Sequence, residues 1–219
     1  FLLYMVPPER VEAATIRPRE LIFVLDTSGS MYGFPIEKSK EVMTRMLGAM
    51  RADDTFNIIT FAGDHHVLWS EPRPASEENI RIARDFVQSR QGRGGTEMMK
   101  AIEAALRPTD CPIVAPATRW TRDEHASIST PAQRTPSDSS AQSDGNPPRA
   151  SAAAAPPMRL ALFFTEGYVG NDIAIIDAVR RYSGSTRVFS FGIGDSVNRY
   201  LLAEMARAGR GAVDFVLSS

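Results

Sequence analysis

Three short segments of the chain carry side-chain oxygens in patterns suited to binding a hard metal ion. The first places a carboxylate and two hydroxyls at alternate positions, Asp26, Ser28 and Ser30. The second adds a hydroxyl, Thr96, after a run of glycines, and the third adds a second carboxylate, Glu166. Carboxylate and hydroxyl oxygens are the ligands that hard cations such as Mg²⁺ prefer. The sequence therefore predicts a divalent-cation site built from segments far apart in the chain.

Two acids at one site require a compensating charge. If Asp26 and Glu166 lie at the ends of neighbouring strands, their carboxylates repel each other, and a cation between them removes that cost. Gly29 allows the backbone to turn tightly between the two serines. Taken alone, however, the first segment is also typical of turns and helix N-caps, and Thr96 of an N-cap. The prediction therefore depends on all three segments meeting.

The apolar patterning predicts the elements that would bring these segments together. Residues 21–26 form a continuous apolar run ending in an acid, as in a strand buried on both faces of a parallel sheet. Further strands are predicted at 55–61, 66–69, 159–165, 188–194 and 212–217, and helices at 35–51, from 76 to the glycines at 92–95, at 96–106, 172–182 and 197–208.

This alternation of strands and helices predicts the fold class. It is an α/β fold with a doubly wound, mostly parallel six-stranded sheet, helices on both faces and one antiparallel edge strand, which makes it Rossmann-like. Ligands of such sheets bind at the carboxyl ends of the strands. The segments that hold Asp26 and Glu166 directly follow two of the predicted strands.

A stretch of different composition interrupts the pattern at residues 108–157. It is rich in Pro, Ser, Thr and Ala and has few large aliphatic side chains, so it cannot bury enough surface to offset the entropy of ordering it. We predict a disordered insertion, and we expect that removing residues 112–155 leaves the domain folded. The remaining chain is expected to form one domain over residues 21–219.

The composition argues against several classes of function. A formal net charge of -1 gives no overall field that would attract nucleic acid. The single cysteine, Cys111, has no partner for a disulfide or a thiolate metal site. No apolar run approaches the roughly 20 residues that cross a bilayer. The chain is interpreted as a fragment, because its first residues look like the end of an upstream domain and its last residues form a strand-like run, and any membrane anchor is expected outside it.

Sequence signatures of common enzymes on this fold are missing. The chain has no G-x-x-x-x-G-K-[ST] loop, no G-x-G-x-x-G after the first strand and no serine in a G-x-S-x-G turn. His65 and His66 fall in a predicted edge hairpin away from the three segments, which favours surface histidines over catalytic ones. These observations favour a binding module over a nucleotide-using or hydrolytic enzyme.

Together, the three segments resemble a known metal-binding motif. Asp26-x-Ser28-x-Ser30 after an apolar strand, the run 94–96 and the strand end at 165–167 resemble the metal-ion-dependent adhesion site of von Willebrand factor type A domains. Within that family, the segments 23–31, 94–98 and 167–171 look like those of bacterial relatives of inter-alpha-trypsin inhibitor heavy chains. Residues 1–20 resemble the linker that precedes the type A domain in those proteins.

The resemblance implies a Mg²⁺ ion, with Mn²⁺ or Ca²⁺ as alternatives, bound directly by Ser28, Ser30 and Thr96. Asp26 and the acid of the third segment would act directly or through water. An open coordination position would take an Asp or Glu carboxylate of a protein partner. The family normally has Asp where this chain has Glu166, whose extra methylene either replaces a bridging water or weakens the site.

The function implied by this resemblance is cation-dependent protein binding without catalysis, in the cell envelope or outside the cell. Two other functions remain open at this stage. One is a metal-dependent hydrolase or nucleotide-using enzyme on a Rossmann-like fold, because fold alone does not decide function. The other is a structural domain whose site is empty.

Overall fold

The computed structural model describes residues 17–107 and 156–218. Its elements, in chain order, are β1 (Arg19–Asp26), the short 3-10 helix η2 (Gly29–Met31), α1 (Phe34–Gly48), β2 (Thr55–Phe61), β3 (His65–Val67), β4 (Arg73–Pro74), α2 (Glu77–Gln88), α3 (Met98–Leu106), β5 (Met158–Thr165), α4 (Asp172–Tyr182), β6 (Arg187–Ile193), α5 (Arg199–Ala208) and β7 (Val213–Val216). Most of the predicted linker (1–20) and insertion (108–157) lies outside the described residues, so both stay predictions.

All the strands form one sheet in the order β3-β2-β1-β5-β6-β7, with β4 also paired to β2. The pairs among β2, β1, β5, β6 and β7 are parallel, and β3 and β4 run antiparallel to β2. This confirms the predicted fold class, but the predicted number of six strands was wrong. The seventh strand, β4, has two residues, one of them Pro74, and is too short for an alternating pattern to reveal.

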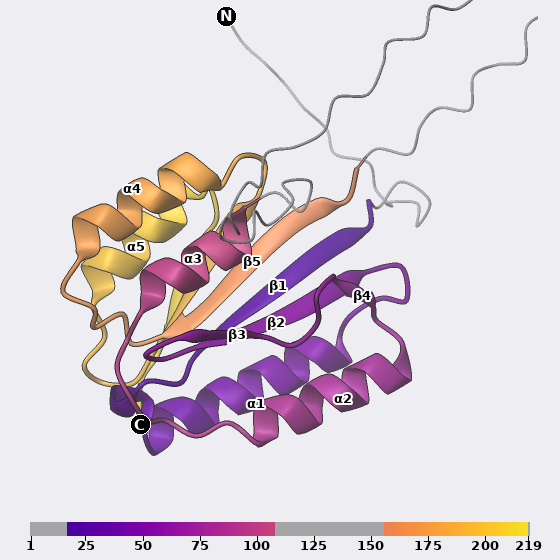
Figure 1. Ribbon diagram of the computed structural model, residues 1–219, viewed down its shortest axis with the longest axis horizontal. Helices are drawn as coiled ribbons and strands as arrows, with labels where there is room; N and C mark the ends of the chain where they lie inside the picture. The colour runs from indigo at the N-terminus through magenta and orange to yellow at the C-terminus, as the bar shows by residue number, and fades with distance from the viewer. Residues whose placement is uncertain (1–16, 108–155, 219) are drawn as a thin grey trace, which may run out of the picture. The chain divides into compact units, whose positions relative to one another are not determined.

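Helices cover both faces of the sheet, with α1 and α2 on one face and α3, α4 and α5 on the other (Figure 1). Strand β1 lies in the middle and contributes to both cores. Ile22 and Val24 pack in the core with α3, α4 and α5, whereas Leu21, Phe23 and Leu25 pack in the core with α1 and α2. This explains why the strand is apolar at every position instead of at alternate ones.

Helix α3 begins at Met98, two residues later than predicted. Glu97, the N-cap, has a φ of -104° and a ψ of 62°, outside the helical region, and its amide donates to the carbonyl of Ala62, directly after β2. Thr96 consequently belongs to the loop between α2 and α3, close to the end of β2.

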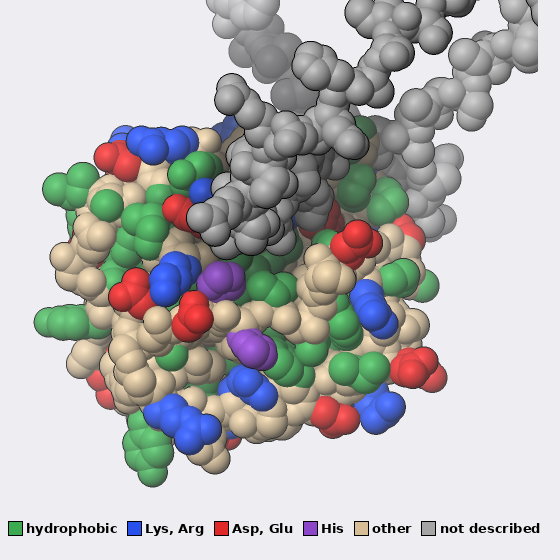
Figure 2. All heavy atoms as spheres, viewed as in Figure 1, with side chains coloured by type: hydrophobic (Ala, Val, Ile, Leu, Met, Phe, Trp, Pro, Cys, Tyr) green, Lys and Arg blue, Asp and Glu red, His purple; other side chains and the backbone are tan. Residues whose placement is uncertain are grey.

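Charges of both signs are interspersed over the face seen in Figure 2, where Lys and Arg side chains alternate with Asp and Glu instead of gathering into a patch. This fits the near-neutral sequence, which has 25 basic and 26 acidic side chains. Within the described parts of the chain, none of the helices combines the length and the hydropathy needed to cross a membrane.

Candidate metal centre

The candidate centre begins where the two central strands, β1 and β5, end side by side. The register pairs Leu25 with Phe164, so Asp26 and Thr165 end these strands together. The hydroxyl of Thr165 donates to Oδ2 of Asp26 at 2.6 Å. Although Asp26 is only 1% exposed, its carboxylate faces this polar edge instead of the apolar core.

The loop after β1 folds back on Asp26. The amide of Ser28 donates to Oδ1 of Asp26 at 2.8 Å, which forms a tight turn after the strand. The chain then enters η2, and the hydroxyls of Ser28 and Ser30 lie 3.2 Å apart. Ser28 is buried and Ser30 is exposed, so this pair leads from the buried carboxylate to the surface.

The glycine-rich loop between α2 and α3 is attached to the same edge through its backbone. The amide of Gly29 donates to the carbonyl of Gly94 at 3.0 Å, and the amide of Glu97 donates to the carbonyl of Ala62 at 2.6 Å. Gly94 has a φ of +91°, a conformation that disfavours any side chain. Thr96 lies between these two attachments and is half-buried, so its loop is joined to the loop after β1 as predicted.

Glu166 follows β5 and is 7% exposed. Its carbonyl accepts a 2.8 Å hydrogen bond from the amide of Asn198, which fixes the backbone at this point. A Cβ placed on Gly194, at the end of β6, would lie 3.1 Å from Oε1 of Glu166. The side chain of Glu166, which is one methylene longer than that of Asp, therefore extends to Gly194, where glycine leaves the room that it needs.

The two carboxylates are electrostatically uncompensated. Burial raises the pKa of Asp26 above its ordinary value, against the opposing effect of hydrogen bonds from Ser28 and Thr165. Burial also raises the pKa of Glu166, a hydrogen bond from Ser30 lowers it, and the nearby charge of Asp26 raises it further. Among the ion pairs of residues 17–107 and 156–218, none involves either acid. A positive charge at this edge would relieve both effects.

The donor set is rich in hydroxyls and poor in charged ligands. In the described part of the chain, no three His, Cys, Asp or Glu side chains gather into a metal cluster. A cation here would therefore depend on the hydroxyls of Ser28, Ser30 and Thr96 as well as on the two carboxylates. These oxygen donors fit Mg²⁺, Mn²⁺ or Ca²⁺, which accept oxygen ligands, better than a metal that prefers sulfur.

Three residues of this edge were not assigned a role from the sequence. Thr165 orients Asp26, Gly194 makes room for Glu166, and Asn198 holds the backbone of Glu166. Thr165 could have been found, because a hydroxyl at the end of a strand beside an acidic strand end is a natural hydrogen-bond donor. Gly194 and Asn198 could not, because their contacts depend on how β6 and α5 pack.

Comparison with known families agrees with this geometry. A sequence model of the von Willebrand factor type A domain matches residues 19–142 and 151–215, most of the chain. The chain belongs to the von Willebrand factor type A family. The family accounts for the mostly parallel sheet and its covering helices.

Several curated proteins share this type A domain. A von Willebrand factor A domain-containing protein of Dictyostelium discoideum is 26% identical over 203 residues, which cover 91% of this chain and 8% of that protein. Human inter-alpha-trypsin inhibitor heavy chain H4 is 34% identical over 110 residues, which cover 50% of this chain and 11% of that protein. The chain thus spans only a small part of the length of these relatives.

Solved structures show the same type A fold. BatB from Bacteroides thetaiotaomicron has a TM-score of 0.61 at 18% identity and covers 92% of this chain and 91% of its own. Manganese-loaded TRAP protein of Plasmodium vivax has a TM-score of 0.56 at 15% identity, covering 87% of this chain and 63% of its own. Proximal thread matrix protein 1 from mussel byssus has a zinc-occupied metal-ion-dependent adhesion site (MIDAS) motif. Its structure has a TM-score of 0.51 at 12% identity, covering 93% of this chain and 42% of its own.

Proposed function

We propose that this type A domain binds a divalent cation through Asp26, Ser28, Ser30, Thr96 and Glu166 and uses it to bind an acidic side chain of a protein partner. The observation that carries the proposal is the buried carboxylate of Asp26, which has two hydroxyls and a second carboxylate as neighbours and no basic partner among the described ion pairs. Burying such a group without a counter-charge is costly. A bound cation would offset that cost.

Relatives with bound metals support the proposal. The TRAP structure is manganese-loaded, and one structure of the mussel thread protein has zinc in its MIDAS motif. We assign Mg²⁺ to this chain, with Mn²⁺ and Ca²⁺ as alternatives, because its donors are hard oxygens. When bound, the cation would supply positive charge and a coordination position for an Asp or Glu carboxylate of the partner.

The surface beside the polar edge is suited to contact with a protein. Tyr32 directly follows η2 and is 77% exposed, and Tyr168 lies two residues after Glu166 and is 74% exposed. Exposed tyrosines are enriched at protein interfaces, where they give a large contact area at low entropic cost. Membership of the type A family likewise supports a protein-interaction module.

A thermal-shift experiment tests the metal site directly. A ligand that binds only the folded state must raise the melting temperature, so Mg²⁺ should stabilise the wild-type chain by an amount that grows with the logarithm of its concentration above the dissociation constant. Asp26→Ala should abolish this shift. Asp85→Ala, which removes an exposed acid on α2, should retain it. An unchanged shift in Asp26→Ala would contradict the proposal, and the lack of any shift in the wild type would favour a structural domain with an empty site.

A second experiment separates binding from catalysis. If the domain is a binding module, EDTA removes partner binding, and the protein turns over no ester, peptide or nucleotide substrate with Mg²⁺ present. Metal-dependent hydrolysis would instead favour the enzyme alternative. For the location of the whole protein, we propose the cell envelope or the exterior, which surface labelling of intact cells would test.

A further inference from the structure

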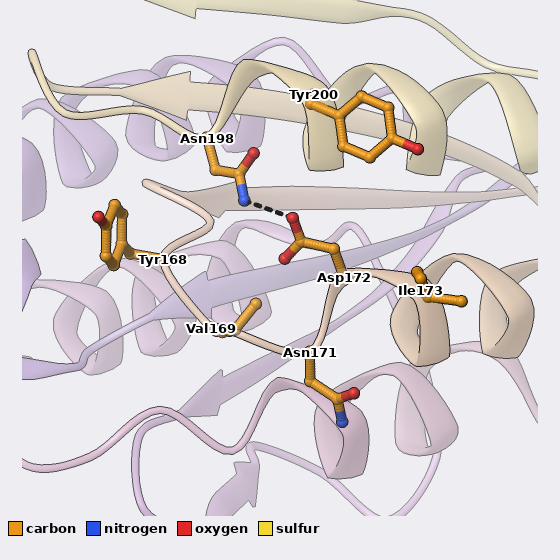
Figure 3. Close-up of a pocket in the computed structure, with 8 residues that line it drawn as sticks. Tyr168, Val169, Asn171, Asp172, Ile173, Asn198 and Tyr200 are labelled. Atoms are coloured by element: carbon orange, nitrogen blue, oxygen red, sulfur yellow. Dashed lines mark hydrogen bonds between the residues drawn. The ribbon is translucent and has the colours of Figure 1, made fainter.

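A hollow of about 660 Å³ begins at Tyr168, two residues after Glu166 of the proposed metal centre, and lies at the N-terminal ends of α4 and α5. One wall comes from the loop after β5 and the first turn of α4, and the other comes from the first turn of α5 (Figure 3). The residues used below are Tyr168, Asp172, Ile173, Asn198 and Tyr200.

The rim of this hollow exposes large apolar side chains to water. Tyr168 is 74% exposed, Ile173 is 76% exposed and Tyr200 is 63% exposed. Isolated exposed apolar residues are ordinary, but three of them around one hollow form a patch of the kind that marks an interaction site. Figure 3 shows that Tyr200 and Ile173 come from different helices, α5 and α4, so that each wall of the hollow contributes one of them.

Two polar side chains of the hollow, those of Asn198 and Asp172, are engaged in hydrogen bonds. Nδ2 of Asn198 donates to Oδ2 of Asp172 at 2.9 Å, and Oδ1 of Asn198 accepts from the amide of Leu201 at 3.1 Å. Asp172 is the only charged residue among those that line the hollow. The lining therefore contains no basic side chain for a second acid, and most of its accessible surface is apolar.

The hollow is continuous with the metal centre through the chain itself. Asn198, which holds Asp172, also donates its amide to the carbonyl of Glu166 at 2.8 Å. Tyr168 is two residues from Glu166, so their Cα atoms lie within about 7 Å of each other. A ligand on the metal and a ligand in the hollow would thus be neighbours on one partner surface.

We infer that the hollow receives an apolar side chain, such as Leu, Ile, Met or Phe, from the same protein partner whose carboxylate binds the metal. The inference rests on the proposed metal-dependent function and specifies the partner further. Because an extended chain advances about 3.3–3.6 Å per residue, the partner's apolar residue lies about two positions from its acid. The recognised motif is an acid with an apolar residue at this fixed spacing.

The experiment is a selection of displayed random peptides on the whole chain in Mg²⁺, eluted with EDTA. We expect eluted peptides to combine an Asp or Glu with an apolar residue at the stated spacing. A synthetic copy of a selected peptide is then titrated by fluorescence anisotropy. Ile173→Ser and Tyr200→Ser should each weaken binding about tenfold, since each removes apolar surface from the contact. The matched control is Leu217→Ser, which removes an exposed apolar side chain outside the hollow and should change nothing.

A double-mutant cycle makes the assignment specific. Replacing the apolar residue of the peptide by Ser should weaken binding about as much as Ile173→Ser, and the two changes together should cost little more than either alone. The variants must retain the Mg²⁺-dependent thermal shift, which shows that they fold and keep the metal centre. Additive losses would overturn the contact between the two side chains.

Two results separate failure of this inference from failure of the proposed function. In the first result, the selected peptides need Mg²⁺ and an acid but show no apolar preference, and they bind Ile173→Ser as tightly as wild type. This would overturn the role of the hollow and leave the metal-dependent function intact. Peptides that carry no acid and remain bound in EDTA would overturn the metal-dependent function, and the coupled motif with it.

Discussion

The hydroxyl of Thr165 connects the two acidic segments of the type A domain. It donates to Oδ2 of Asp26 at 2.6 Å and accepts from the amide of Gly167 at 2.8 Å. Because the amide of Gly167 can only donate, the single hydroxyl proton of Thr165 is directed at Asp26. This hydrogen bond fixes one oxygen of Asp26, and the amide of Ser28 fixes the other.

Removing this hydroxyl should weaken both the fold and the metal centre. Thr165→Val keeps the shape but leaves the amide of Gly167 and Oδ2 of Asp26 without a partner, so we expect the free energy of unfolding to fall by about 1–3 kcal/mol. We also expect weaker Mg²⁺ binding, because Asp26 is no longer held in place. Urea unfolding and calorimetric titration measure the two effects. Thr165→Ser is the control, and full Mg²⁺ affinity in Thr165→Val would refute the orienting role.

A second prediction concerns Glu166, the acid of the third polar segment. Glu166→Asp restores the residue that the resemblance leads one to expect and shortens the side chain by one methylene. Because the carboxylate of Glu166 now extends to Gly194, we expect the shorter acid to retain or strengthen Mg²⁺ binding once it withdraws toward Asp26. Glu166→Gln, which keeps the length and removes the charge, should weaken binding. A large loss of calorimetric affinity in Glu166→Asp would contradict this prediction.

Gly194 should be intolerant of a side chain for two separate reasons. It has a φ of +114°, and an added Cβ would lie 3.1 Å from Oε1 of Glu166 and 3.2 Å from Cγ of Pro35. We expect Gly194→Ala to lower the free energy of unfolding by about 1–3 kcal/mol and to displace Glu166. Combining Gly194→Ala with Glu166→Asp should restore part of the Mg²⁺ affinity, because the shorter acid avoids the Cβ. A double variant whose change in Mg²⁺ affinity equals the sum of the two single changes would show that the two positions are not in contact.

The elements that position the candidate metal centre were predictable from the sequence, because they follow regular apolar patterns. The strands and helices around Asp26 and Glu166 follow from apolar runs and helical spacing, and the parallel order brings their carboxyl ends to one edge. The meeting of the first and second segments is confirmed by the hydrogen bond between Gly29 and Gly94. Cation binding by the five residues stays a prediction, as does the insertion at 108–157.

Contacts that depend on side-chain packing between distant elements were not predictable. Gly194 shows no pattern that relates it to Glu166, and the hollow exists only because α4 and α5 begin side by side after different strands. The apolar residues on its rim are also inconspicuous in sequence. Ile173 fits the apolar pattern of α4, yet it is 76% exposed in the folded chain.

Asp54 shows that a buried acid in this domain can have a purely structural role. It ends the turn that leads into β2, at the opposite end of the strands from the candidate metal centre, and is fully buried. Arg19 donates to Oδ1 from its backbone amide and from Nε, both at 3.1 Å, and the amide of Arg51 donates to Oδ2 at 3.0 Å. Burial acts to raise the pKa of Asp54, but the hydrogen bonds from Arg19 and Arg51 outweigh it and hold the pKa well below its ordinary value.

This arrangement predicts a pH-dependent contribution to stability. Because the pKa of Asp54 is lower in the folded than in the unfolded chain, the unfolded chain binds more protons in acid. The contribution to stability is therefore full above the ordinary pKa of Asp, and it is lost as the pH falls toward the pKa of the folded chain. At neutral pH, Asp54→Asn should lower the free energy of unfolding by roughly 3 kcal/mol, since both arginines lose a charged acceptor. The exposed neighbour Asp53 provides the control variant, Asp53→Asn, which should cost much less. The free energy of unfolding of wild type and Asp54→Asn, measured in urea from about pH 7 to about pH 2, should converge in acid. A constant difference between the two proteins would show that the ionised form of Asp54 is not the stabilising one.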